Sequence, residues 1–337
     1  MKAARLTAAR KIELCEVDTP VPSADEVLIR TKAVGICGSD LHIYQGHRPD
    51  IELPRVMGHE ISGEIVETGT DVKDLKAGDR VVVDPVVYCG DCYACRRGKN
   101  HLCTTIKCLG CQVDGGFSEY FTSPVKNVYT INDDISWTHG AMVEPFSIGA
   151  QVFGRSEYSD GDRVVIFGAG TIGLCVLQVF KLMGARVLIT DVIDSRLAVA
   201  ESLGADVIVN NKTGSLEEKT AEFTGNEGAD IVIDAVGHYS IIKEGMKVLT
   251  KGGRIVVLGL TKEDTGLTEF DFVRTEIDIR GSVLNNMKFP QVINWLNSGK
   301  LNPVPLITGV YPVEKIGDAF EAILSSPADS LKVMVTF

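Results

Sequence analysis

Four cysteines lie close together in the first third of the chain, and their spacing suits a metal ion. They are Cys89, Cys92, Cys95 and Cys103. Thiolates two residues apart on one loop can turn toward a common centre, and four of them complete the tetrahedral shell of zinc. A complete shell leaves no position for a substrate, so a zinc ion held here is structural. Disulfide pairing is disfavoured, because the chain lacks the short secreted context of disulfide-rich domains.

A second set of metal-binding residue types is more dispersed. It contains Cys37, the pair His59 and Glu60, and Glu144. One thiolate, one imidazole and one carboxylate leave a fourth position for water or substrate, as a catalytic zinc requires. Taken singly, each residue has a simpler explanation, as a core cysteine, a satisfied histidine or a solvated glutamate. The set is therefore a hypothesis for a catalytic metal site.

A glycine-rich turn follows a predicted strand and opens a predicted helix. It contains Gly168, Gly170 and Gly173. The first glycine permits a tight turn, the second lets a pyrophosphate approach the backbone, and the third lets the helix pack on the strand. Asp191 ends the next strand, where a carboxylate accepts hydrogen bonds from ribose hydroxyls and repels a 2′-phosphate. The pattern predicts a dinucleotide site that prefers NAD to NADP.

Further residues are expected at the same cofactor site. Arg196 follows Asp191 by five positions and is placed to cover the adenine, although a solvated surface arginine is a close alternative. The remaining candidates lie in the helix after the turn and at the end of a later strand: Ile172, Leu258 and Gly259.

The predicted pattern of strands and helices changes near residue 147. Residues 1–146 contain short strands broken by turns, such as those at 26–31, 63–69 and 80–85, and predict a β-rich lobe. Residues 147–287 alternate apolar strands with helical patterns, which predicts an α/β domain with a doubly wound parallel sheet. The strands are expected at 163–167, 187–190, 207–210, 231–234, 254–258 and 277–280. The tail, 288–337, is expected to pack on the first lobe, which makes the nucleotide domain an insertion.

Length and charge narrow the function classes. The 337 residues exceed the usual size of one core, 45% of them are hydrophobic, and the formal net charge is −11. An acidic chain is a poor partner for nucleic acid or an anionic membrane, and the longest uncharged run is interrupted by glycines. The first residues have scattered charges rather than an apolar block, so no secretion signal is expected. Nine cysteines in such a chain favour a reducing cytoplasm.

Several motifs together resemble one enzyme family over essentially the whole chain. They include Gly35-Ile-Cys-Gly-Ser-Asp40, Gly58-His-Glu60, the four-cysteine lobe and Val143-Glu-Pro145. These motifs resemble the zinc-dependent medium-chain alcohol dehydrogenases, and most closely their polyol and sugar-acid branch. The resemblance implies a GroES-like catalytic domain at 1–146 plus 288–337, with a Rossmann NAD-binding domain inserted at 147–287. It also implies two zinc ions per chain, NAD, and a homotetramer or homodimer joined through sheet edges, with 277–280 as a candidate edge strand.

The resemblance also implies roles for individual residues. Ser39 and His42 match positions that relay the proton released by the substrate hydroxyl, and Asp40 matches one that orients the metal-binding histidine. Glu60 and Glu144 both match positions that approach the zinc, and the sequence leaves open which of them binds at rest. The substrate hydroxyl would bind the zinc, and hydride would pass from carbon to the nicotinamide.

The substrate is predicted as a small sugar acid or polyol oxidised at a secondary hydroxyl, as in L-gulonate and L-galactonate 5-dehydrogenases. Alternatives are a sorbitol, galactitol-phosphate or L-threonine 3-dehydrogenase, and, from another class, a catalytically silent NAD sensor. Val283 stands where many relatives have an arginine, which weakens the case for an anionic substrate. Cys111 and Gln112 also depart from the family pattern. Cys108 and Cys111 have metal spacing but no second pair nearby, so a third metal site is disfavoured.

Overall fold

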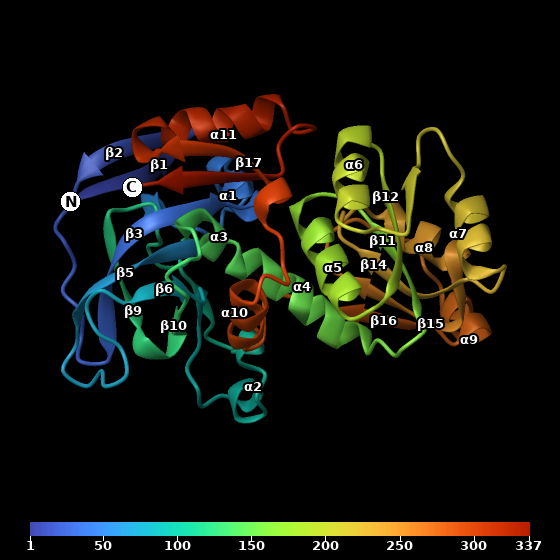
Figure 1. Ribbon diagram of the computed structural model, residues 1–337, viewed down its shortest axis with the longest axis horizontal. Coiled ribbons are helices and arrows are strands. Elements are labelled where there is room, and N and C mark those ends of the chain that lie inside the picture. The colour runs from blue at the N-terminus through green and yellow to red at the C-terminus, as the bar shows by residue number, and fades with distance from the viewer. The chain divides into compact units, whose positions relative to one another are not determined.

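A computed structural model describes residues 1–337, and Figure 1 shows its helices and strands. The chain divides into two compact units. The first contains residues 1–144, 286–299 and 303–337, and the second contains residues 145–285 and 300–302. The chain thus enters the first unit, builds most of the second, and returns to the first.

The first unit is built on a seven-stranded sheet. Its strands follow the order β10-β6-β5-β3-β18-β17, and β9 also pairs with β3. Their bounds are β3 Glu26–Ile36, β5 Glu60–Thr68, β6 Arg80–Val83, β9 Tyr120–Pro124, β10 Val128–Thr130, β17 Ile307–Pro312 and β18 Lys332–Thr336. The last strand of the chain lies antiparallel to β3, with Val333 opposite Ile36. The C-terminal strand β18 therefore lies inside this sheet, between β3 and β17.

Smaller elements complete the first unit. They are β1 Lys2–Ala8, β2 Lys11–Glu16, α1 Gly38–Tyr44, β4 Arg55–Val56, β7 Val86–Val87, α2 Tyr93–Arg96, β8 Lys107–Cys108, α3 Trp137–Ala141, α10 Phe289–Asn297 and α11 Ile316–Ser325. The core brings distant parts of the chain together, since the Phe320 ring of α11 packs against Tyr44 and Phe117. Burial of these aromatic rings fixes α1 and the segment around Phe117 on one scaffold.

The second unit contains a six-stranded sheet in which every pair of neighbours is parallel. The strand order is β13-β12-β11-β14-β15-β16. The bounds are β11 Arg163–Phe167, β12 Arg186–Asp191, β13 Val207–Asn210, β14 Ala229–Asp234, β15 Leu249–Val257 and β16 Asp278–Gly281. This order reverses between β11 and β14, which is where doubly wound sheets bind their ligands. The predicted α/β class with a parallel sheet is confirmed.

Helices connect the strands of the second unit. They are α4 Val143–Ser156, α5 Thr171–Leu182, α6 Asp194–Ser202, α7 Leu216–Thr224, α8 Ser240–Val248 and α9 Glu269–Thr275. Every residue of α5 from Gly173 to Phe180 is buried, because this helix follows β11 across the sheet. The uncharged run in the sequence is thus β11, the glycine turn and α5. No helix in the chain combines the length and apolarity that a membrane span needs.

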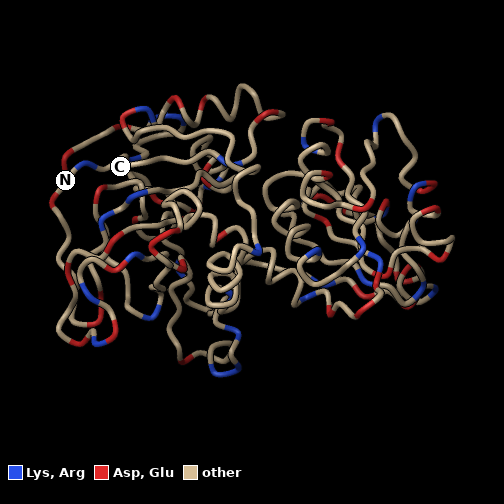
Figure 2. Tube along the Cα trace, viewed as in Figure 1, with Lys and Arg blue, Asp and Glu red and all other residues tan.

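Charged residues are distributed along the whole chain. Figure 2 shows acidic positions interspersed with basic ones in both units. With a formal net charge of −11, the chain lacks the basic excess that nucleic-acid binding uses.

Candidate active site and metal centres

The four cysteines of the α2 region form one cluster. The Sγ atoms of Cys89, Cys92, Cys95 and Cys103 all lie within 4.8 Å of one another. The Sγ atoms of Cys92 and Cys95 are 3.5 Å apart, as are those of Cys103 and Cys89. Four sulfurs converging at this separation can hold a tetrahedral zinc ion without any other ligand.

Backbone amides prepare these sulfurs for a cation. The N–H groups of Asp91 and Cys92 donate to Cys89 Sγ at 3.4 and 3.3 Å. Backbone donation from Cys95 and Thr104 lowers the pKa of Cys92 to about 5, so that its thiolate is favoured. Thiolates bind zinc and thiols do not, so these backbone contacts favour the metal-binding form of Cys92, whereas burial raises the pKa of Cys95 to about 12.

The second cluster contains three of the predicted catalytic ligands. Cys37 follows β3 and precedes α1, while Glu60 begins β5 and His59 immediately precedes it. One ligand atom from each of the three residues lies within 4.8 Å of the other two. His59 and Glu60 are buried, and Cys37 is half-buried. Because β3 and β5 pair along their length, the sheet itself brings these donors together.

Asp40 connects α1 to this cluster. Its Oδ2 accepts a hydrogen bond of 2.9 Å from the N–H of Cys37, and its Oδ1 lies 3.5 Å from His59 Nδ1. The carboxylate is fully buried. Burial opposes the charged imidazole, but Asp40 and Cys37 together raise the pKa of His59 well above its ordinary value. Asp40 therefore lies beside the Nδ1 edge of the ring, although its Oδ1 and His59 Nδ1 do not form a hydrogen bond.

Lys332 is a neighbour of this cluster that sequence reasoning missed. Its Nζ donates to Glu60 Oε1 at 2.6 Å and to the carbonyl of Ile36 at 3.0 Å, and the residue is buried. Burial opposes its charge, yet Glu60 and Cys37 raise the pKa of Lys332 above its ordinary value. The only available signal was a lysine inside the apolar final strand. Opposite it, a Cβ at Gly35 would lie 1.9 Å from Glu60 Oε2, so only glycine leaves room for this carboxylate.

Glu144 lies outside the three-residue cluster but shares its environment. It is buried, and burial raises the pKa of Glu144 to about 8, with His59 acting against the rise and Glu60 adding to it. The structure therefore favours Glu60 over Glu144 as the carboxylate beside Cys37 and His59. Ser39 and His42 lie on α1 directly after Cys37, with Ser39 half-buried and His42 exposed.

The donor sets of both clusters fit zinc. Glu60 Oε2 is buried and has no hydrogen-bond partner, although its other oxygen is bonded. A buried carboxylate oxygen without a partner is costly, and a cation between it, Cys37 and His59 would remove that cost. Thiolate, imidazole and carboxylate are also the ligand types that zinc accepts, and three of them leave one position open.

The glycine turn of the second unit borders a cavity of about 340 Å³. Gly168, Gly170, Asp191 and Arg196 line it, together with Asn211 and Val236. Gly168 has a φ of +96°, so a residue with a side chain would be strained there. A Cβ at Gly173 would lie 1.8 Å from the Gly168 carbonyl oxygen, which explains the third glycine of the pattern.

Asp191 faces the cavity and also accepts hydrogen bonds from the backbone of the glycine turn and of the residues that follow it. Its Oδ2 accepts from Ala169 N–H at 2.7 Å, and its Oδ1 accepts from the N–H groups of Val192 and Ile193 at 2.7 and 3.0 Å. Not every predicted cofactor residue lines the cavity. Four lie elsewhere in the unit, on α5 and after β15: Ile172, Gly173, Leu258 and Gly259.

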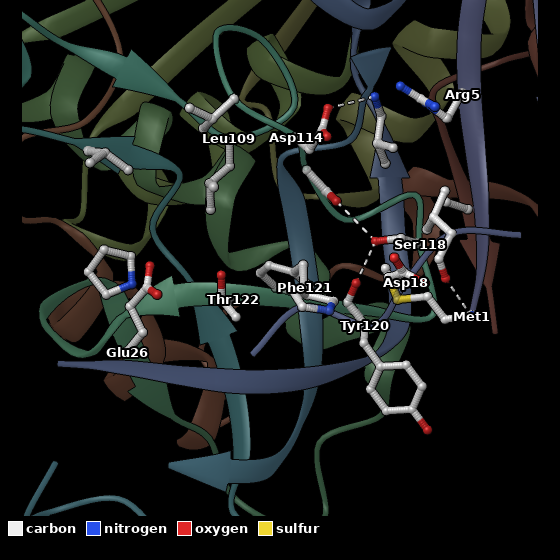
Figure 3. A pocket seen from close by; sticks show the side chains of 18 residues that line it. Met1, Arg5, Asp18, Glu26, Leu109, Asp114, Ser118, Tyr120, Phe121 and Thr122 are labelled. Carbon is white, nitrogen blue, oxygen red and sulfur yellow. Dashed lines mark hydrogen bonds between the residues drawn. The ribbon is translucent and has the colours of Figure 1, made fainter. Parts of the chain in front are cut away.

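A separate pocket of about 500 Å³ lies in the first unit, between β1 and β9 (Figure 3). Arg5 and Asp18 face it, and Ser118 closes one side by donating to the carbonyls of Gly115 and Tyr120 at 3.3 and 2.9 Å. None of the predicted metal ligands lines this pocket. The residues with metal-binding chemistry therefore lie elsewhere.

Comparison with known proteins agrees with this architecture. Residues 23–133 match the model of the alcohol dehydrogenase GroES-like domain, and residues 171–298 match that of zinc-binding dehydrogenases. The starvation-sensing protein RspB of Escherichia coli K12 is 39% identical over 100% of this chain and 99% of its own length. Sorbitol dehydrogenase of Bacillus subtilis is 35% identical over 99% and 97%. L-galactonate-5-dehydrogenase of Escherichia coli K12 is 34% identical over 95% and 94%.

A solved structure supports the same assignment. RspB from Escherichia coli CFT073, complexed with NADH, superimposes with a TM-score of 0.95 at 40% identity and covers 100% of this chain and 99% of that one. The match covers both units of this chain. The chain therefore belongs to the zinc-binding alcohol dehydrogenase family, and it is an oxidoreductase.

Proposed function

We propose that this dehydrogenase oxidises a secondary hydroxyl of an open-chain sugar acid or polyol, with Cys37, His59 and Glu60 holding the catalytic zinc. The buried cluster of three different donors carries this proposal, because it leaves one coordination position for a substrate oxygen. Relatives named for sorbitol and for L-galactonate, both similar over nearly the whole chain, support the substrate class.

Each protein group has a separate task in this proposal. A bound zinc ion supplies Lewis acidity, which lowers the pKa of a hydroxyl held at the open position. Asp40 keeps the His59 ring oriented, and Lys332 holds one oxygen of Glu60 so that the other faces the cluster. Ser39 and His42 carry the released proton outward along α1, from a half-buried position to an exposed one.

The sugar-acid reading requires a cation that recognises the carboxylate. Arg48 is our candidate in the first unit. Its charge and that of His59 both contribute to lowering the pKa of Cys111, which is lowered first by the interaction with Cys108. Arg48 and His59 therefore both interact electrostatically with the Cys111 thiol. Its guanidinium is paired with Asp50, the Nε–Oδ1 distance being 2.7 Å, so it is already oriented by a carboxylate.

A comparison of substrates tests the hypothesis that the enzyme prefers sugar acids. A carboxylate held by a charged donor gains about 1.5–3 kcal/mol, so L-gulonate or L-galactonate should exceed the matching hexitol by roughly 10- to 150-fold in kcat/KM. Arg48→Met should bring that ratio near one, while Arg30→Met, which replaces an exposed arginine of β3, should leave it unchanged. A ratio near one in the unaltered enzyme would favour polyols, and no turnover of either class would favour the sensor.

We also propose that Asp191 selects NAD over NADP. Asp191→Asn keeps only one of the two oxygens that accept hydrogen bonds from the turn, and it removes the charge that repels a 2′-phosphate. NAD affinity should fall by about 1.5–3 kcal/mol, the usual value of a hydrogen bond to a charged group, and the gap to NADP should narrow. Cofactor titration followed by protein fluorescence measures both. An unaltered enzyme that prefers NADP would contradict the proposal.

Assembly and location remain predictions as well. The strand β16 is an edge of its sheet, so its free side is available for pairing in a homodimer or homotetramer. Nine cysteines without a disulfide suit a reducing compartment such as the cytoplasm. Sedimentation of the metal-loaded protein would give the oligomer size.

A further inference from the structure

Cys108 and Cys111 enclose a tight turn that no step of the proposed reaction uses. The N–H of Cys111 donates to the carbonyl of Cys108 at 3.1 Å, and Gly110 between them has a φ of +77°. Such a turn keeps its first and fourth Cα atoms within about 7 Å, which overlaps the range that a disulfide spans. Neither cysteine forms a disulfide in this structure. The backbone therefore holds two thiols at a separation that permits a bond.

The two side chains also interact with each other. Their mutual interaction is the largest influence on both: it raises the pKa of Cys108 well above its ordinary value and lowers the pKa of Cys111. A thiolate is the nucleophile of disulfide exchange, so Cys111 is the sulfur that attacks and Cys108 the one that completes the bond.

This turn packs directly on the backbone that leads into His59. A Cβ at Gly110 would lie 2.7 Å from the nitrogen and oxygen of Gly58, so the two glycine backbones are in contact. The following segment is tied to the same residue, since Gly116 N–H donates to the Gly58 carbonyl at 2.8 Å. Gly58 immediately precedes His59. A shift of the turn therefore displaces the backbone next to a candidate metal ligand.

The opposite side of the segment has room to move. Leu109 and Val113 line the 500 Å³ pocket between β1 and β9, and Figure 3 shows Leu109 beside this space. A close-packed interior would resist the shift that bond formation requires, whereas an adjoining cavity permits it. The turn from Cys108 to Cys111 therefore has the Gly58 backbone on one side and the pocket on the other.

We propose that Cys108 and Cys111 are a reversible disulfide site whose oxidation disturbs the Cys37, His59 and Glu60 cluster through Gly110 and Gly58. The oxidant is a small-molecule disulfide. The Cys111 thiolate attacks one of its sulfurs and expels the other as a thiolate, which gives a mixed disulfide. The Cys108 sulfur then attacks Cys111, loses its proton to solvent and expels the second small thiolate. The protein loses two electrons and two protons, and the small disulfide becomes two thiols.

The first experiment tests the bond itself. The zinc-loaded enzyme is incubated with mixtures of reduced and oxidised glutathione, quenched in acid, alkylated and digested. We expect the peptide with Cys108 and Cys111 to escape alkylation and to be two hydrogens lighter, and dithiothreitol to reverse both changes. Cys108→Ser and Cys111→Ser should abolish this product, while Cys15→Ser, a half-buried cysteine on β2, should retain it. Full alkylation of both cysteines in oxidised glutathione would overturn the proposal.

The second experiment tests the coupling to the metal in the unaltered enzyme, with one variant as the control. Cobalt(II) replaces zinc, glutathione is removed, and the visible absorption of oxidised and reduced enzyme is compared. We expect a changed spectrum and about 10-fold faster removal of the His59-bound metal by a chelator, the usual size of a disturbed ligand-supporting contact. Cys111→Ser, treated in the same way, should show no such difference. Identical spectra and removal rates in a fully disulfide-bonded enzyme would overturn the coupling.

Discussion

The two candidate metal clusters of the first unit differ both in their ligands and in how they are assembled: one has four thiolates, and the other has a thiolate, an imidazole and a carboxylate. The four-cysteine cluster comes from one loop around α2, and backbone N–H groups prepare its sulfurs. The three-residue cluster comes from two paired strands, and side chains from α1 and β18 surround it. One site is local and complete, and the other is distributed and open. The first therefore suits structure, and the second suits chemistry.

Charge compensation differs in the same way. At the loop cluster, only the cation itself can neutralise four thiolates, so folding of the loop depends on the metal. At the strand cluster, Asp40 faces His59 and Lys332 faces Glu60. Fixed side-chain charges therefore keep the ligands in place when the metal is absent. The comparison predicts that metal loss unfolds the four-cysteine loop, whereas at the strand cluster it abolishes activity and leaves the fold intact.

The largest effect is expected from Cys95→Ser, which removes a buried ligand of the loop cluster. Zinc binding contributes about 10–16 kcal/mol to the folding of small zinc domains, and the loop around α2 should lose a large part of such a contribution. Metal analysis should find one zinc fewer, and thermal unfolding should begin at a lower temperature. An unchanged melting curve would show that the cluster is not structural.

Cys37→Ser should have the opposite profile. Turnover should fall at least about 1,000-fold, which corresponds to about 4 kcal/mol of transition-state stabilisation. The melting temperature should change by only a few degrees, because Asp40 and Lys332 still hold the neighbouring ligands. Steady-state kinetics and calorimetry on the same preparation check both expectations. If Cys37→Ser lowered the melting temperature as much as Cys95→Ser does, the assignment of one cluster to structure and the other to catalysis would be wrong.

Lys332→Met tests whether fixed charge supports the open cluster. Removing one partner of a buried ion pair usually costs about 3–5 kcal/mol, because the other charge stays buried and unpaired. Urea unfolding of the metal-free protein should show that loss. Glu60→Gln in the Lys332→Met background should recover part of it, since the two effects are coupled through a 2.6 Å contact. Strict additivity of the two substitutions would mean that Lys332 does not support Glu60.

The smallest expected effect is a pH dependence that comes from Glu144. Burial raises its pKa to about 8, above the ordinary value of 4.5, so the folded metal-free protein keeps the proton longer than the unfolded chain does. The stabilisation is complete at pH values below the unfolded pKa and is lost as pH rises toward 8. Between pH 5 and pH 7 the loss should be about 2–3 kcal/mol. Urea unfolding at both pH values measures it, and Glu144→Gln should remove this part of the pH dependence.

Local patterns account for the features that sequence reasoning predicted best. The cysteine spacing, the glycine turn before α5 and the alternation of strands and helices each lie within a short stretch of chain. Short-range geometry determines whether such residues can converge, so their arrangement follows from spacing alone. The parallel sheet predicted from this alternation is confirmed by the strand pairing.

Long-range contacts account for what was missed. Lys332 is separated from Glu60 by 272 positions, and no spacing rule connects a lysine of the last strand with a glutamate of β5. The contact between Gly110 and Gly58 could not be predicted from the sequence either, because it depends on how two separate loops pack together.

The sequence by itself determined which residues can bind metal and dinucleotide, and where the parallel sheet begins. Only the tertiary structure decided that Glu60 rather than Glu144 stands with Cys37 and His59, and that Lys332 and Asp40 hold these ligands. The physical reason is that ligand chemistry belongs to the side chain, whereas burial, charge pairing and distance arise only when β3, β5 and β18 pack into one sheet.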